Sequence, residues 1–182
     1  MNTLIVIRYD SNMNKIGIYD NLNKNFERDS GIKPSHILDQ PTRNELISFL
    51  IEFPEQADKL ILHFISHGNI EGFGKELLNT EDGCLIGDKE TLIEWSIFVE
   101  LLNIVSVKCK HLIVNLGSVC NSVNIENVNI NRNFDMLVTT SEIGDLVEPR
   151  KKNKVLINNM DNMGVHCPGD IYKLLRKQSL KI

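Results

Sequence analysis

The sequence lacks long hydrophobic runs and any strong excess of charge. Its longest purely apolar stretches have four residues, as in Leu4 to Ile7, whereas a membrane-spanning helix needs about 20. Its 20 basic and 24 acidic side chains give a net charge of -4, which offers no positive surface for a phosphate backbone. We therefore expect neither a membrane nor a nucleic acid as a partner. Because no signal segment opens the chain, we expect a cytoplasmic location.

The sequence also has few cysteines, and none of them forms a Cys-x-x-Cys pair. The four lie at positions 84, 109, 120 and 167, a spacing that matches no zinc site. No phosphate-binding or dinucleotide-binding glycine motif is present either, so we expect no metal and no other cofactor. Cys109 lies between two lysines and is expected to be the exposed thiol. The 182 residues, 42% of them hydrophobic and 24% charged, are typical of one globular domain covering residues 1–182.

Short runs rich in Ile, Leu and Val predict four buried strands, which are Leu4 to Tyr9, Leu60 to Ser66, His111 to Leu116 and Met136 to Thr140. Such runs are typical of strands that are covered on both faces, as in a parallel sheet. Two capping-box patterns predict helices between the strands, one from Thr42 until Pro54 and one from Thr91 until about Ser106. The alternation predicts an α/β fold, a three-layer sandwich with a mostly parallel central sheet flanked by helices.

Two further elements are predicted from weaker patterns. Lys15 to Tyr19 is flanked by Asn and Asp, which favour turns, and is interpreted as a short extra strand. A helix is expected after Pro168. His63 lies inside a predicted strand and is interpreted as a core histidine whose hydrogen bonds are satisfied.

Two of the predicted strands run directly into residues that can carry chemistry. The strand that ends at Ser66 is followed by His67 and Gly68, and the strand that ends at Leu116 is followed shortly by Cys120. One helix separates the two strands, so we expect them to be neighbours in the sheet. In open α/β sheets the reactive groups gather beyond the carboxyl ends of the strands. A thiol, an imidazole and nearby backbone amides are what a cysteine protease needs.

This pattern resembles the caspase-like clan of cysteine peptidases, which includes caspases, metacaspases, separases and CHAT proteins. In that clan an apolar strand ends in His-Gly, and a second apolar strand ends in the nucleophilic cysteine about 50 residues later. Here the interval is 120 − 67 = 53 residues. The resemblance covers roughly residues 4 to 142 and includes Asp82-Gly83, which is similar to the hairpin of CHAT proteins.

The resemblance implies a caspase-like fold and an endopeptidase that cleaves a protein or peptide substrate, in bacterial defence or regulated cell death. Cys120 would be the nucleophile, His67 would take its proton, and the backbone amides of Gly68 and Cys120 would form the oxyanion hole. The resemblance implies no metal ion at the thiol. A regulatory protein is a further partner that this class of function suggests.

Substrate preference depends in this clan on a charged residue just past the first strand. Asp10 occupies that position, and Glu142 follows the last predicted strand. Together they would form an acidic pocket suited to Arg or Lys. The alternative is that Asp10 opens a turn and that Glu142 faces solvent.

The residues before the nucleophile depart from the family pattern. Ser118 and Val119 stand where caspases have Gln-Ala and where CHAT proteins often have Asn-Ala or Ser-Ala. A second interpretation is therefore a catalytically silent caspase-like protein-binding module. A third is an unrelated α/β ligand-binding or signalling domain in which His67 and Cys120 are incidental.

Overall fold

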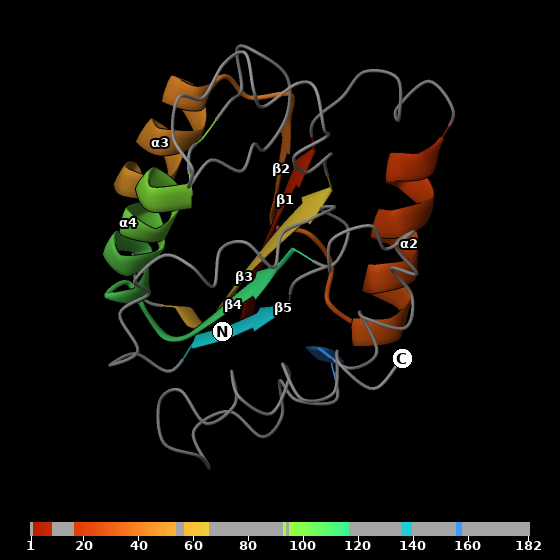
Figure 1. The fold of residues 1–182 in the computed structure, drawn as a ribbon. Helices are drawn as coiled ribbons and strands as arrows, with labels where there is room; N and C mark the ends of the chain where they lie inside the picture. Colours follow the sequence, from red (N-terminus) through yellow and green to blue (C-terminus); the bar gives the residue numbers. More distant parts are fainter. Residues whose placement is uncertain are drawn as a thin grey trace, which may run out of the picture.

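A sheet of five parallel strands runs through the computed structural model, in the order β2-β1-β3-β4-β5 (Figure 1). The strands are β1 (Asn2–Arg8), β2 (His36–Asp39), β3 (Ala57–Ile65), β4 (Cys109–Asn115) and β5 (Met136–Thr139). The structure describes residues 2–8, 17–53, 57–65, 93, 95–116, 136–139 and 156–157. All four strands predicted from apolar runs are confirmed, and β3 begins earlier than predicted, at Ala57.

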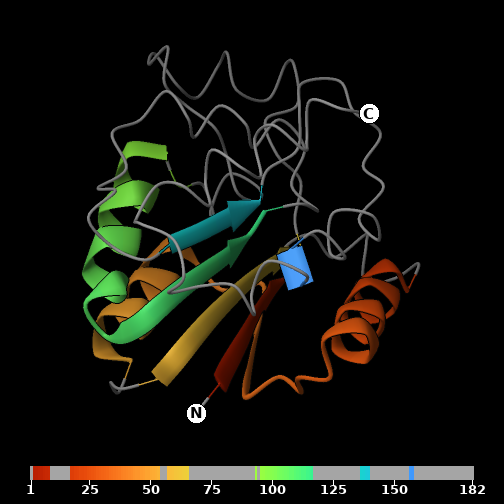
Figure 2. The same cartoon turned by 90° about the horizontal axis from the view of Figure 1, so that it is seen from below.

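Helices cover both faces of this sheet (Figure 2). On one face lies α2 (Ile18–Ser30), and on the other lie α3 (Arg43–Glu52) and α4 (Trp95–Ser106). The chain moves from β1 outward to β2 and then back across β1 to β3. Because parallel crossovers are right-handed, this reversal of direction moves the connecting helix to the opposite face. The predicted α/β architecture, a parallel sheet flanked by helices, is therefore confirmed for the described residues.

The strands bury side chains on both faces, which explains their continuous apolar sequences. In β1, Ile5 and Ile7 pack with the residues of α3 and α4, whereas Leu4 and Val6 pack toward α2. Each face thus has its own hydrophobic core. The core between the sheet and α2 includes Phe26, whose side chain is fully buried.

Helix α3 begins with the capping box that the sequence predicts. The backbone N–H of Glu45 donates to Thr42 Oγ1 (3.3 Å), and the N–H of Thr42 donates to Glu45 Oε2 (2.7 Å). Two backbone donors that lack helical partners are satisfied in this way. The helix ends at Glu52, two residues before Pro54. The predicted helix before Ser106 is confirmed as α4, with Phe98, Val99 and Leu102 buried.

The sequence analysis missed α2, and its prediction of a strand from Lys15 to Tyr19 is wrong. Gly17 adopts a left-handed conformation (φ 71°), and the helix begins at Ile18. Five of the thirteen residues of α2 are Asn or Asp, residue types that favour turns over helix interiors. Packing of Phe26 against the sheet supplies the stability that helix propensity does not.

The sequence analysis also missed β2, because three of its four residues are exposed and it has no apolar run. It pairs with β1 from His36 opposite Ile5 to Asp39 opposite Arg8. Edge strands of this kind depend on backbone pairing, which sequence pattern does not reveal. The predicted helix after Pro168 and the predicted capping residues Thr91 and Glu94 lie outside the described residues.

Candidate active site

The carboxyl ends of β3 and β4 lie side by side at one edge of the sheet. The two strands are parallel neighbours, as predicted, and His63 of β3 pairs in register with Asn115 of β4. β3 ends at Ile65, two residues before His67, and β4 ends at Asn115, five residues before Cys120. Neighbouring strands are about 4.8 Å apart. The described strands therefore bring the chain to neighbouring points two residues before His67 and five residues before Cys120.

The predicted site residues themselves lie outside the described part of the chain. This holds for the catalytic residues His67 and Cys120, for Gly68 of the oxyanion hole, and for the substrate-binding residues Asp10 and Glu142. Their roles and contacts remain predictions from the sequence. The described residues show the edge of the sheet at which β1, β3, β4 and β5 end.

An ion pair lies at the same edge, at the ends of β1 and β2. Arg8 Nη2 is 3.2 Å from Asp39 Oδ2, and only 16% of the Arg8 side chain is exposed. The backbone N–H of Gln40 donates to the carbonyl oxygen of Arg8 (2.7 Å), which holds the end of β1 in place. The positive charge of Arg8 is thus balanced locally. No sequence motif marks this pair, because it depends on the register of β1 with β2.

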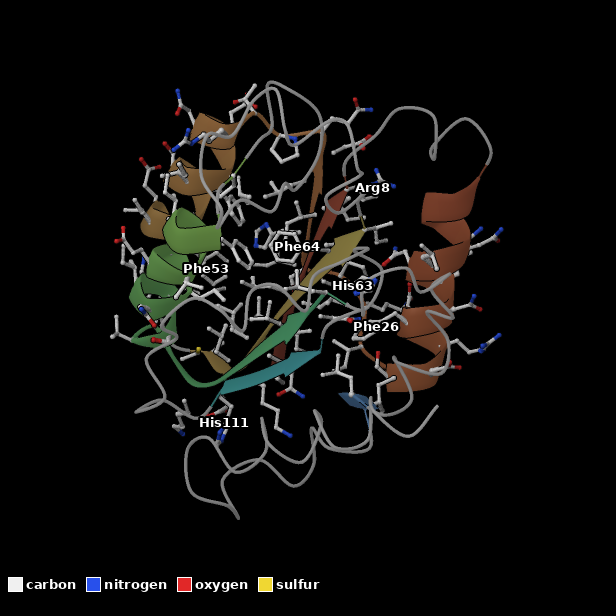
Figure 3. The ribbon with its side chains drawn as sticks, in the orientation of Figure 1. Arg8, Phe26, Phe53, His63, Phe64 and His111 are labelled. Atoms are coloured by element: carbon white, nitrogen blue, oxygen red, sulfur yellow. The ribbon has the colours of Figure 1, made fainter. Side chains whose placement is uncertain are left out.

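A buried polar pair joins β3 and β4 close to their carboxyl ends. Asn115 Nδ2 donates to His63 Nδ1 over 2.7 Å, and both side chains are fully buried. The imidazole also stacks on Phe26 of α2, with ring centroids 4.5 Å apart and an interplanar angle of 17° (Figure 3). Elsewhere on this face the two strands contribute Ile61, Ile65 and Ile113. A histidine and an asparagine therefore interrupt an otherwise aliphatic surface.

The environment of His63 keeps its ring neutral. An amide N–H can only donate, so Nδ1 accepts, and the proton of the neutral ring lies on Nε2. Burial lowers the pKa of His63 to about 3, because the charged form loses its hydration. His63 Nε2 has no hydrogen-bond partner within the part of the chain that the structure describes. The prediction that His63 is a core histidine is therefore confirmed, and the described residues satisfy its Nδ1.

Cys109 differs from the exposed thiol that the sequence predicts. It lies at the start of β4, packs against the core under α3 and α4, and is only partly exposed. Burial raises the pKa of its thiol to about 11. The flanking lysines do not lower it, since Lys110 pairs with Asp58 (2.7 Å) and Lys108 Nζ donates to the Phe53 carbonyl oxygen (3.1 Å). Cys109 is consequently a poor nucleophile at neutral pH.

Neither protein-family models nor curated proteins match this chain. Among the described residues, no group of three or more His, Cys, Asp or Glu side chains is placed to hold a metal ion. No helix in that part of the chain is long and apolar enough to cross a membrane.

Proposed function

We propose that this protein is a cytoplasmic cysteine endopeptidase with a caspase-like fold. It cleaves a protein or peptide substrate through His67 and Cys120. The observation that carries the proposal is the parallel pairing of β3 with β4, whose carboxyl ends lie at the same edge of the sheet and come before His67 and Cys120 in the sequence. Parallel α/β sheets bind ligands at this edge. The order β2-β1-β3-β4-β5, with helices on both faces, is that of a doubly wound sheet.

In the proposed reaction, His67 takes the thiol proton of Cys120, and the thiolate attacks the carbonyl carbon of the scissile bond. The backbone N–H groups of Gly68 and Cys120 stabilise the oxyanion. The protonated imidazole then gives its proton to the leaving amine, and the C–N bond breaks to leave a thioester. A water molecule, deprotonated by the imidazole, hydrolyses the thioester and restores the thiol. No metal or cofactor takes part in this proposal.

We further propose that Asp10 and Glu142 select a basic residue before the cut. Arg8 lies two residues before Asp10, and its charge is balanced by Asp39 at 3.2 Å. Arg8 therefore does not offset the negative charge of the proposed acidic pocket. Cleavage of an unbiased peptide library would show Arg or Lys before the scissile bond, and a preference for acidic or apolar residues there would refute the pocket.

Selective alkylation tests the dyad. A peptidyl chloromethylketone with arginine before the ketone would modify Cys120, and peptide mapping by mass spectrometry would locate the adduct. Cys109 is the internal reference, because burial raises its thiol pKa to about 11. His67→Ala would slow labelling of Cys120 and leave that of Cys109 unchanged. Cys120→Ser would abolish the Cys120 adduct.

The alternatives give different outcomes in the same experiment. In a catalytically silent protein-binding module, the peptidyl reagent would label Cys120 no faster than it labels an ordinary free thiol, and His67→Ala would change nothing. An unrelated ligand-binding domain would give the same labelling result. Either outcome would reject the endopeptidase proposal.

A further inference from the structure

The hydrogen bond between His63 and Asn115 lies at the last rung of the β3–β4 ladder. The register of these strands runs from Ala57 opposite Cys109 to His63 opposite Asn115, and the described residues show no β3–β4 pair beyond it. β3 itself continues to Ile65, where it still pairs with Arg8 of β1. The His63–Asn115 pair is therefore the last β3–β4 pair that the structure describes before His67 and Cys120 in the chain.

This pair is close in sequence to both residues of the proposed dyad. His67 follows His63 by 67 − 63 = 4 residues, and Cys120 follows Asn115 by 120 − 115 = 5 residues. A shift of one strand relative to the other at the pair would move the starting points of both segments. Reactions between two positioned groups lose about a hundredfold in rate for a misplacement of about 1 Å.

Two contacts and burial restrict the imidazole ring. Phe26 stacks on one face of it at 4.5 Å, the Asn115 amide fixes Nδ1, and the ring is fully buried. Helix α2 is thereby connected through the imidazole to β4. Two apolar side chains at these positions would avoid the cost of burying polar groups. Buried polar pairs of this kind specify one arrangement of the elements that they join.

We propose that His63 and Asn115 are a positioning pair that sets the separation of His67 and Cys120 by joining the carboxyl ends of β3 and β4. This inference rests on the proposed function. The pair acts through the strands and does not touch the substrate. Its effect is therefore on the reactivity of the Cys120 thiolate.

Two substitutions of His63 separate positioning from simple packing. His63→Asn keeps an acceptor near the position of Nδ1 but loses ring volume and the stack on Phe26. His63→Phe keeps the volume and the stack but loses the acceptor. We expect the reagent to label Cys120 faster in His63→Asn than in His63→Phe. In His63→Phe the labelling rate should fall about tenfold or more relative to wild type. Equal labelling rates for the two folded variants, or a faster Phe variant, would overturn the proposal.

Asn115→Leu tests the same hydrogen bond from the other strand, in case a His63 variant does not fold. It keeps a similar volume and removes the amide donor. We expect it to slow labelling as His63→Phe does, and wild-type labelling rates in folded Asn115→Leu would overturn the proposal. Ile61→Ala is the matched control, because Ile61 lies on the same face of β3 opposite Ile113 and has no polar group to bond to β4. It should lower stability and leave the labelling rate unchanged.

All variants are measured as folded protein, with circular dichroism and urea unfolding to confirm the folded fraction. Failure of the wild-type protein to label at Cys120 would overturn the proposed function, and this inference with it. Normal wild-type labelling that is unaffected in His63→Phe and Asn115→Leu would overturn the inference alone.

Discussion

Mild acid should destabilise this protein through His63. The ring is fully buried, and burial lowers its pKa to about 3, whereas a histidine in the unfolded chain has a pKa of about 6.5. Between these values the unfolded chain binds a proton that the folded protein does not. The free energy of unfolding therefore falls as the pH falls below about 6.5, and it stops falling near pH 3.

The magnitude follows from the difference between the pH and the pKa of the unfolded state. At pH 5 that difference is about 1.5 units, and each unit corresponds to about 1.36 kcal/mol. His63 should thus remove about 2 kcal/mol of stability between pH 7 and pH 5. This is a large share of the roughly 5 to 15 kcal/mol that stabilises a typical domain.

Urea unfolding at pH 7 and pH 5, with the wild-type protein and His63→Phe, measures this contribution. Other titrating groups contribute equally to both proteins, so the difference between the two pH dependences isolates His63. The lowered pKa values of Asp58, which pairs with Lys110, and of Glu45, which bonds to Thr42, affect stability only at lower pH. We expect wild type to lose about 2 kcal/mol more than His63→Phe between these pH values. Equal losses would show that the His63 ring is not held neutral in the folded state.

Two further pairs of substitutions test the fold. Phe26→Ala should lower the free energy of unfolding by about 3 to 5 kcal/mol, because it leaves a cavity between α2 and the sheet, and Ile37→Ala, at a side chain 48% exposed, should cost about 1 kcal/mol or less. If Phe26→Ala and Ile37→Ala lower the free energy of unfolding by similar amounts in urea, the packing of α2 through Phe26 is contradicted. Thr42→Ala should cost about 1 kcal/mol by removing the α3 cap, whereas Thr42→Ser should retain most of it; equal stability of these two variants would contradict the capping role.

Part of the candidate site could be predicted from sequence, and part could not. Two apolar runs mark in the sequence where two strands end. One comes directly before His67-Gly68, and the other comes shortly before Cys120. The connection through one helix predicts that the strands are neighbours, which their register confirms. The hydrogen bond between His63 and Asn115 could not be predicted, because two residues 52 positions apart become partners only when the register is fixed. The signal available in the sequence was one polar residue inside each apolar run, His63 in the first and Asn115 in the second.

The sequence by itself determined the strands that are buried on both faces and the start of α3. These features are local, since a continuous apolar run or a capping box carries its own physical cause. Tertiary structure decided the rest. Helix α2 depends on Phe26 meeting the sheet, and β2 depends on backbone pairing with β1. The low reactivity expected of Cys109 and the neutral state of His63 result from burial, which depends on side chains distant in the sequence.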